Sequence, residues 1–346
     1  MQVALEQYND FMKDTLADLG EPDFTDISSD LTQHVAMDEI LQENHAEISS
    51  GSQIQFNLLV AQSNQARHIT PGEPDNPGMR DGMIQGVIPW RCTQTDYVLI
   101  HQLVTMNGGK RQIVDFVKQQ RLMALISLAE LMEKTFWNPP VATDAKTPYG
   151  LPYYVTKSTT KGFTGDVLAG YTNCAGITPS QYPRFQNYVY PYTTLTRDDF
   201  TRGAREASVQ CDFRPTVPGI PQPYTGKKYR YYCGYPVYQA LEDSLENQND
   251  SLGSDIASQD GKVMFHGVPV TYVPFLNGDT TNPFYGIDWG WAKIAIARGE
   301  WMRETQIPHS PTSHNIACNY IDLMWNLIFK NRRAAFVVTN GATYPG

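Results

Sequence analysis

The stretch from residue 110 to residue 137 constrains the fold most. It reads KRQIVDFVKQQRLMALISLAELMEKTFW and contains neither proline nor glycine. Its apolar residues recur at steps of three and four, the spacing of one helix face; they are Ile113, Val114, Val117, Ala124, Leu125, Leu128, Leu131 and Met132. Asn138-Pro139-Pro140 ends the pattern because proline cannot continue a helix. At ~1.5 Å per residue the helix would run roughly 40 Å, so we expect either a buried core helix or a long spine for the whole fold.

Charge is distributed unevenly along the chain. The net charge is −9, which argues against a dedicated nucleic-acid-binding protein. Residues 1–50 hold twelve Asp or Glu against the single Lys13, so the remainder is close to neutral and slightly basic. Tyrosine is common, with 20 residues, and proline reaches 23. This composition is typical of chains with large contact surfaces, or simply of a loop-rich β protein.

The five cysteines are far apart and show no CxxC or Cys/His spacing, so neither a zinc site nor a disulfide framework is expected. Reduced thiols in a cytosolic chain fit this pattern best. The first ten residues lack the features of a secretion signal. The longest apolar run, Leu122–Leu128, contains Ser127 and precedes Glu130, so no membrane span is expected.

No pattern of residues indicates catalysis. Gly108-Gly109-Lys110 lacks the first glycine and the Ser/Thr of a phosphate-binding loop, and GxSxG, HExxH and GxGxxG are absent from the sequence. His309 and His314 have a spacing that matches no common metal motif. The pairs Asp198-Asp199 and Glu242-Asp243 would point apart on a helix. We therefore expect no catalytic residue, no cofactor and no metal, and a structural role.

Two helices are expected before residue 50. Residues 3–19 carry an amphipathic stripe, and residues 30–47 a thinner one. Neither stripe offers enough apolar surface to fold alone, so both helices should lie on another surface, either of the same chain or of a neighbour.

Residues 51–109 predict a projecting β-ribbon. Gln53–Val60 and Thr93–Val104 have the pattern of strands, and some thirty residues rich in Pro, Gly, Asn and Gln separate them. So long a loop is usually functional or a linker, and an isolated ribbon is marginally stable. A partner surface is therefore expected, although a loose insertion is the alternative. The candidate subunit-interface residues, chosen because Arg and Trp are favoured at interfaces, are Arg67, Arg80, Trp90, Arg91, Arg111 and Arg121.

The second half of the chain predicts a mixture of helices and strands, and hence an α+β fold. Helices are expected at 196–210 and 236–247, and an ordered loop held by aromatic residues at 170–190. The predicted strands are Tyr149–Val155, Tyr229–Cys233, Lys262–Pro274 with an interruption at Gly267, Pro283–Ala297, Asn315–Leu327 and Ala334–Thr339.

The order of these parts resembles the major capsid proteins of tailed double-stranded DNA phages, which have the Hong Kong-97-like fold, and particular phrases are similar to podovirus-type members. These phrases are the passage from residue 107 into the 110–137 helix, Ala175-Gly176-Ile177 followed by Tyr182–Asn187, and VMFHGVPV at 263–270. The resemblance implies an N-terminal arm at 1–50, an extended loop at 51–109, a peripheral domain at 110–195 and 311–341 that contains the spine helix, and an axial domain at 196–310.

The resemblance also implies a function. The chain would self-assemble as pentamers and hexamers into an icosahedral head that encloses DNA without binding it specifically. Scaffolding, portal and cementing proteins would be its other partners, with assembly in the host cytoplasm. Some family members join subunits by an isopeptide bond from a lysine in the extended loop, but residues 51–109 contain no lysine, so no such bond is expected. An encapsulin-like compartment shell and an enzyme with an unrecognised site are the alternatives.

Overall fold

The computed structural model describes residues 35–36, 45–48, 51–60, 66–70, 78, 82–100, 102, 110–212, 229–249, 263–307 and 315–341. Side chains are not described for 45–48, 110–116, 245–249 and 306–307. The expected helix at 3–19 and both His309 and His314 lie outside the described residues.

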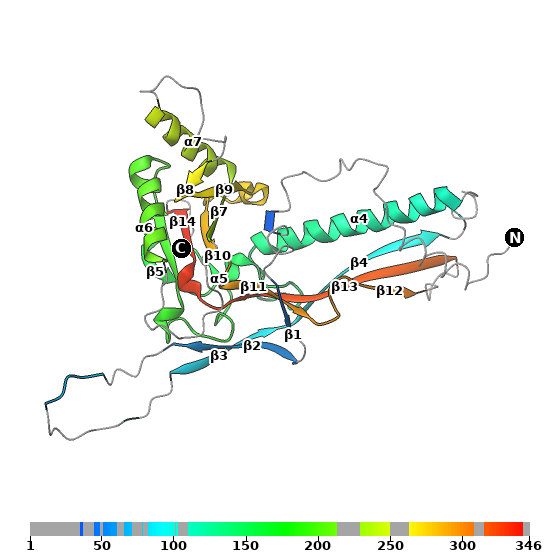
Figure 1. Cartoon of the computed structure of the whole chain (residues 1–346), viewed down its shortest axis with the longest axis horizontal. Helices are drawn as coiled ribbons and strands as arrows, with labels where there is room; N and C mark the ends of the chain where they lie inside the picture. Colours follow the sequence, from blue (N-terminus) through cyan, green and yellow to red (C-terminus); the bar gives the residue numbers. More distant parts are fainter. Residues whose placement is uncertain are drawn as a thin grey trace.

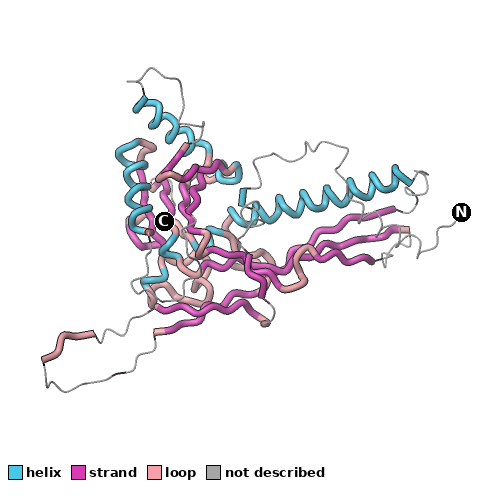
Figure 2. Tube along the Cα trace, in the orientation of Figure 1, coloured by secondary structure: helices cyan, strands magenta, loops and turns pink. Residues whose placement is uncertain are grey.

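The molecule has a compact domain, a long arm and a projecting ribbon (Figure 1). The arm consists of one helix lying along a narrow sheet, and the ribbon leaves the body in roughly the opposite direction. Figure 2 shows that helices cover the outer side of the compact domain, whereas strands run from this domain into the arm. The architecture is α+β, as the sequence predicts.

The arm contains the expected long helix, α4, which spans Lys110–Trp137. Among its described side chains, Val117, Ala124, Leu128 and Met132 are buried. They recur at steps of seven, four and four residues, which places them on one helix face. The apolar periodicity therefore predicted the helix and most of its buried face, although Leu131 of the predicted stripe is 48% exposed.

The central strand of the arm is β13, Ile316–Phe329. One edge of β13 pairs with β4, Arg91–Ile100, along ten residues. The other edge pairs with β11, Ala292–Ala297, and then with β12, Arg303–Ile307. Strand β1, His45–Ile48, adds to β11 in parallel. The helix predicted for 30–47 is therefore wrong at its C-terminal end, where backbone pairing with β11 produces a strand.

The ribbon is an antiparallel hairpin of β2, Gln53–Leu59, and β3, Met83–Pro89. The prediction that Thr93–Val104 forms its second strand is wrong, because that segment belongs to β4 and pairs with β13. The reason is burial: Tyr97 and Leu99 of β4 are almost fully buried in the arm, which an isolated ribbon could not provide.

The compact domain is built on a seven-stranded sheet of order β5-β6-β14-β10-β7-β9-β8. The strands are β5 Gly162–Gly165, β6 Asn187–Tyr192, β7 Tyr229–Cys233, β8 Met264–Phe265, β9 Val268–Tyr272, β10 Phe284–Asp288 and β14 Phe336–Asn340. The helices are α5 Leu151–Tyr154, α6 Arg202–Gln210 and α7 Tyr235–Asn249, with a π-helical turn at Arg197–Thr201 before α6. Short 3-10 turns, η1, η3 and η4, cover Pro183–Phe185, Pro274–Gly278 and Arg332–Ala334.

This sheet joins strands that the sequence assigned to different domains. Strands β5, β6 and β14 come from the ranges expected for the peripheral domain, whereas β7 to β10 come from the axial range. Strand β11 also comes from the axial range, yet it pairs in the arm sheet. Strand pairing therefore passes from one sheet to the other between Asp288 and Ala292, and back again between Phe329 and Phe336.

Three predicted strands differ from the structure. Tyr149–Val155 contains the helical turn α5, because Gly150 lies against the end of α4 and Pro152 fits a first helical turn. Lys262–Pro274 is a β8–β9 hairpin whose two turn residues, His266 and Gly267, have φ of 49° and 78°, as a tight primed turn requires.

Pro283–Ala297 is not one strand but two, in different sheets. Strand β10 ends at Asp288, whose Oδ1 accepts the Gly290 N–H at 3.0 Å. The chain turns there and resumes as β11 at Ala292. Apolar residues on both sides of the turn continue the same pattern, so the sequence alone does not separate the strands.

Candidate assembly surfaces

The exposed end of the ribbon carries large apolar side chains among polar neighbours. Ile54, Phe56 and Ile88, near the base, are buried, and the Val87 N–H donates to the Ala175 carbonyl at 2.9 Å, which ties the hairpin to the body. Towards the tip the pattern changes: Leu59 is 68% exposed and Met83 59% exposed, and they face each other in the register. Ile69, in the loop beyond them, is 58% exposed. Apolar side chains gathered at a projecting tip are typical of a contact surface.

Trp90 and Arg91 lie at the base of the ribbon and make contacts within the subunit. The Trp90 indole N–H donates to the Gly51 carbonyl at 3.0 Å. The Arg91 guanidinium lies over the Tyr149 ring, with its central carbon 5.8 Å from the ring centroid. Asn326 supports the same point, since its Nδ2 donates to the Pro89 carbonyl at 2.8 Å. These two predicted interface residues therefore fix the direction in which the ribbon leaves the body.

The remaining predicted interface residues are spread over the ribbon and the arm. Arg67 is exposed in the loop beyond β2. Arg80 and the side chain of Arg111 lie outside the described residues. Arg121, on α4, donates from Nε and Nη2 to Glu304 Oε1 of β12, at 2.8 and 2.5 Å. This half-exposed ion pair links the helix to the sheet edge of the arm. Among the described side chains, Trp90 and Arg91 are adjacent at the base of the ribbon, whereas Arg67 lies in the ribbon loop and Arg121 on the arm.

A buried carboxylate anchors the chain near residue 36 to the end of the spine helix. Glu133 is fully buried, and its Oε1 accepts the Ala36 main-chain N–H at 2.9 Å and the Trp137 indole N–H at 2.6 Å. Ala36 is also fully buried. The chain that follows residues 1–34 is therefore fixed at one point on α4.

A buried arginine holds the compact domain together. Arg332 is fully buried, and its guanidinium donates only to neutral oxygens in the described part of the chain. Their positions span η1, β5, β6 and the end of α5; they are the main-chain oxygens of Tyr154, Gly165, Asp166 and Phe185, and the side-chain oxygens of Thr156 and Asn187. Because a buried charge is very costly when its donors are unpaired, these segments are constrained to converge on Arg332.

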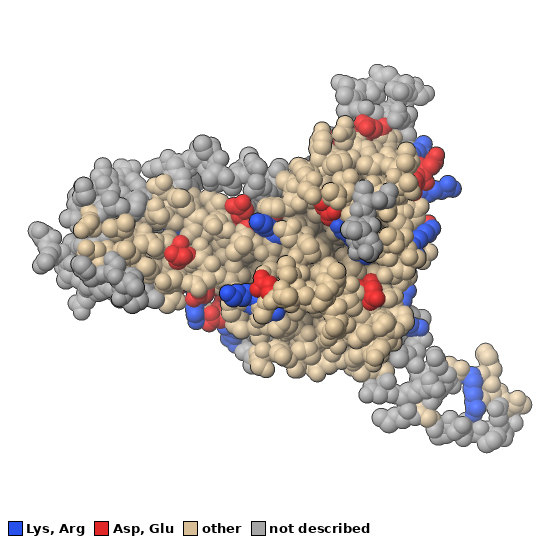
Figure 3. Space-filling view, turned by 180° about the vertical axis from the view of Figure 1, so that it is seen from behind, with Lys and Arg blue, Asp and Glu red and all other residues tan. Residues whose placement is uncertain are grey.

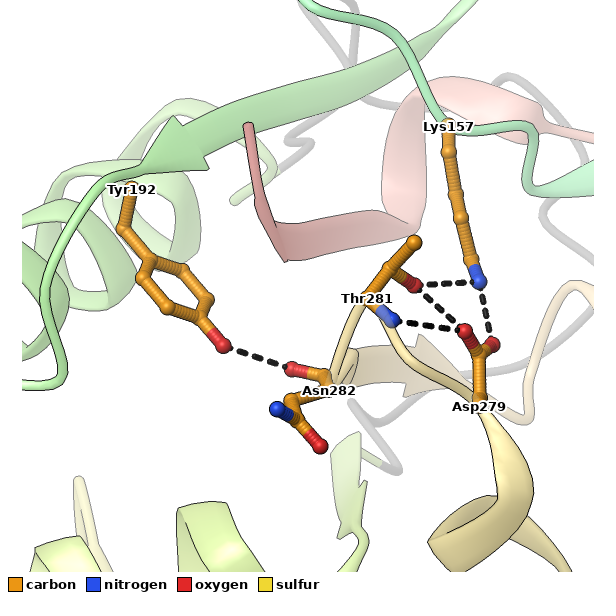
Figure 4. Close-up of polar contacts among 5 residues, drawn as sticks. All are labelled: Lys157, Tyr192, Asp279, Thr281 and Asn282. Carbon is orange, nitrogen blue, oxygen red and sulfur yellow. Dashed lines mark hydrogen bonds and ion pairs between the residues drawn. The ribbon is translucent and has the colours of Figure 1, made fainter. Parts of the chain in front are cut away.

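Lys157 and Asp279 form a second link, shown in Figure 4. The Lys157 ammonium donates to Asp279 Oδ2 and to Thr281 Oγ1, and Thr281 donates its own N–H and hydroxyl to Asp279 Oδ1 at 3.0 and 2.6 Å. Burial alone would raise the pKa of Asp279, but the hydrogen bonds from Lys157 and Thr281 outweigh it and lower the pKa. Beside them, the Tyr192 hydroxyl donates to the Asn282 carbonyl at 3.0 Å.

The pair borders a cleft of about 490 Å³ between the end of α4, α5 and η3. Its wall is otherwise largely apolar, with Trp137, Leu168, Phe275 and Tyr285 among its residues. Lys157 and Asp279 satisfy each other, so neither is poised as a general acid or base. Within the described residues no group of His, Cys, Asp and Glu is arranged to hold a metal ion.

All five cysteines are unpaired thiols. Burial raises the pKa of Cys174, Cys211 and Cys233, the last to about 12. Thiols with raised pKa are poor nucleophiles, since the thiolate is the reactive form. No helix in the described part of the chain is long and apolar enough to cross a membrane.

Sequence reasoning missed Glu133, Arg332 and the Lys157–Asp279 pair. Glu133 lies inside the predicted 110–137 helix, but no sequence pattern singled out its carboxylate, Arg332 or the Lys157–Asp279 pair. Their partners lie far along the chain: 97 residues for Glu133 and Ala36, and 122 for Lys157 and Asp279. No local spacing signals such contacts.

Known structures share this architecture over nearly the whole chain. The capsid protein of cyanophage A-1(L) has a TM-score of 0.57 at 14% identity, and the match covers 92% of this chain and 96% of that one. The capsid of a native GTA particle has a TM-score of 0.57 at 9% identity, with 93% and 95% covered. The SrpI encapsulin of Synechococcus elongatus has a TM-score of 0.53 at 11% identity, and the match covers 94% of this chain and 95% of that one. No family model and no curated protein matches the sequence. The chain therefore has the fold of capsid subunits, and the Hong Kong-97-like fold expected from the sequence is confirmed.

Proposed function

We propose that this protein is the structural subunit of an icosahedral phage head, assembling with copies of itself as pentamers and hexamers around a DNA genome. The observation that carries the proposal is the coverage of the capsid chains: over 90% of this chain matches over 90% of each of them. The ribbon, the arm and the compact domain are thus all parts of one shared architecture.

The shape of the subunit fits closed assembly. The ribbon carries an apolar tip away from its own body, so this tip can be buried only against another molecule. A contact between two different faces of the same chain is heterologous, and it closes into a ring when the rotation between copies divides a circle. The GTA particle in the comparison was computed with C5 symmetry, which supports pentamers.

We propose that the parts of the subunit have different roles. Residues 1–50 act as an N-terminal arm, the segment that contains β2 and β3 is the extended loop, and α4 with the arm sheet forms a peripheral domain. The seven-stranded sheet forms an axial domain around the five-fold and six-fold axes. The proposed interface residues are Arg67, Arg80, Trp90, Arg91, Arg111 and Arg121. Of these, Trp90, Arg91 and Arg121 act indirectly, by setting the geometry of the ribbon and the arm.

The partners proposed besides further copies are scaffolding, portal and cementing proteins. We propose that the subunit encloses DNA without specific binding and is neither an enzyme nor a cofactor-binding protein. Its proposed place is the virion, after assembly in the host cytoplasm. An encapsulin-like compartment is the second candidate, because the SrpI encapsulin shares the fold over 94% of this chain.

The first test is to express the chain alone and examine it by size-exclusion chromatography and negative-stain electron microscopy. Closed shells, tubes or sheets built of pentamers and hexamers would support the proposal. If only a small species forms, a candidate scaffold encoded beside the gene is co-expressed. A small oligomer that persists with the scaffold would overturn the shell function and direct attention to the cleft beside Lys157.

Mature shells should contain no covalent ladder that originates in the extended loop. Residues 51–109 contain no lysine, so this loop has no amine for an isopeptide bond. Denaturing gels of mature shells should therefore give a band at monomer mass. A ladder of higher multiples that survives boiling and reduction would contradict the expectation.

A further inference from the structure

The outer side of the compact domain carries a basic surface that its own carboxylates do not neutralise. We define the α6 basic surface as Lys161, Arg184, Arg202, Arg205 and Arg333. In the view of Figure 3, Lys and Arg side chains gather along the margin formed by this side of the domain. The chain as a whole is acidic, with a net charge of −9, so a local excess of positive charge requires an explanation.

The contacts of Lys161 and Arg333 connect the elements that carry these residues. The Arg333 guanidinium lies 4.0 Å from the centroid of the Phe163 ring, and Phe163 packs edge-on against Tyr188. The Tyr188 hydroxyl donates to Glu206 of α6 at 3.0 Å, and Glu206 also accepts from Lys161. These contacts connect β5, β6, α6 and η4 into a continuous patch.

Most of the positive charge on this patch has no carboxylate partner among the residues that the structure describes. Lys161 pairs with Glu206 at 2.7 Å. Within the described residues, no carboxylate lies within ion-pair distance of Arg184, Arg202, Arg205 or Arg333, whereas Arg121 and Arg303 of the arm are both paired. Burial and the nearby positive charge of Arg184 lower the pKa of Arg333. Like charges this close are unfavourable, and an external anion would relieve them.

Negative charge that would complement the α6 basic surface is present elsewhere in the same chain. Residues 1–34 contain eight Asp or Glu and the single Lys13. The chain joins the body at Val35 and Ala36, where Glu133 anchors it to α4. Thirty-four residues can span up to roughly 110 Å when extended, which exceeds the ~40 Å length of α4. The segment can therefore reach the α6 basic surface of its own subunit or of a neighbour.

We propose that the acidic segment 1–34 of this chain docks on the α6 basic surface. Every subunit supplies one segment and one surface, so the local concentration of the segment is high by tethering alone. A nucleic acid is the less favoured occupant, since each copy of the surface is accompanied by a tethered acidic segment that competes with phosphate. The inference goes beyond the proposed function, and it is testable in whatever oligomer the full chain forms.

Zero-length carbodiimide crosslinking of the full-length chain tests the proposal, because the reagent joins only amines and carboxylates already in contact. Mass spectrometry should find Lys161 joined to acids of residues 1–34, with the Lys161–Glu206 product as an internal positive control. The variants Arg202→Lys and Arg205→Lys keep the charge and add an amine, so each should give a new crosslink to the same segment. Exposed Lys146 is the matched control away from the surface, and exposed Lys134, beside the anchor residue Glu133, controls for tethering alone; both should give several-fold fewer products.

Two further measurements decide the outcome. Raising NaCl from 0.1 to 1 M shortens the screening length from about 10 to about 3 Å, so the crosslinks to residues 1–34 should decline while the Lys161–Glu206 product persists. The variant Arg202→Glu/Arg205→Glu should lose the crosslinks to residues 1–34 and leave this segment open to proteolysis. Adding Asp10→Lys, Asp14→Lys and Asp18→Lys to that variant should restore binding of the segment, measured as restored protection of residues 1–34 from proteolysis. Equal crosslinking to Lys134, Lys146 and Lys161 would overturn the proposal. So would loss of duplex-DNA binding in the Glu variant with unchanged crosslinks, because phosphate would then be the occupant.

Discussion

Arg332 in the compact domain and Arg121 in the arm both join segments that are far apart in sequence, but only Arg332 is removed from water. Arg332 reaches six neutral oxygens across four elements, whereas Arg121 meets one carboxylate at a half-exposed edge. The buried charge of Arg332 is thus satisfied entirely by groups of its own domain. The arm and ribbon leave charged contacts and apolar side chains at the surface. We therefore expect neighbouring subunits to bury these groups in an assembly.

This contrast predicts that the stability of an unassembled subunit depends mainly on the compact domain. Substitutions at its buried polar contacts should destabilise the single chain. Substitutions at the tip of the ribbon should leave the single chain unchanged and impair assembly. The four predictions below run from the largest expected change in the free energy of unfolding to the smallest.

Arg332→Met should destabilise the unassembled chain most, by about 3–5 kcal/mol. The variant leaves several buried carbonyl oxygens without donors and removes the group on which β5, β6 and η1 converge. Urea unfolding followed by tryptophan fluorescence measures the loss. The matched control is Arg298→Met, at an exposed arginine, which should change the free energy of unfolding by less than about 0.5 kcal/mol. Equal losses of unfolding free energy in the two variants would contradict the structural role of the buried Arg332 contacts.

Glu133→Ala should cost about 1–3 kcal/mol, because it leaves the buried N–H groups of Ala36 and Trp137 without an acceptor. The loss should appear first as faster amide exchange at Ala36. Glu133→Gln is the matched control, since it keeps an acceptor oxygen at the same position and should lose less. If both variants exchange at the wild-type rate, Glu133 does not anchor the N-terminal segment.

The Lys157–Asp279 contact should make part of the stability pH-dependent. The pKa of Asp279 is lowered in the folded protein, so its contribution is complete above the unfolded value of about 3.9. The contribution is lost as the pH falls through the folded pKa. Asp279→Asn should therefore reduce the urea midpoint at pH 7, and the difference from wild type should shrink near pH 3. A difference of the same size at both pH values would refute the assignment, and Lys157→Met should show the same pH trend.

The helix α4 shows what the sequence could predict. Its bounds and buried face follow from apolar periodicity and from the prolines after Trp137, and the order of elements was enough to indicate the capsid fold. The strands β10 and β11 show where local pattern fails, because apolar residues flank the Asp288–Gly290 turn on both sides and the segment was predicted as one strand. Strand β4 shows a second limit: its pattern fits either a ribbon or a buried sheet, and only pairing with β13 decides between them.

The candidate surfaces were less predictable than the fold, for a physical reason. Arg67, Arg91 and Arg121 were chosen for their residue type, yet Arg91 and Arg121 contact groups of their own subunit. The residues that do distinguish the two regions, Arg332 and Glu133, depend on partners more than 90 residues away. Propensity and periodicity are local, so they identify elements but not the polar contacts that join them.

Leu59→Ser/Met83→Ser should have the smallest effect on the unassembled chain, within about 0.5 kcal/mol, because both side chains are already exposed to water. The same double variant should lose closed shells in electron microscopy, since a polar tip gains nothing by burial against a neighbour. The matched control is Ile54→Ser/Ile88→Ser at the buried base of the same hairpin, which should destabilise the single chain as well. If the tip variant assembles normally, the ribbon is not held by its apolar end. The contacts at its base, where Trp90 and Arg91 set its direction, would then have to carry assembly.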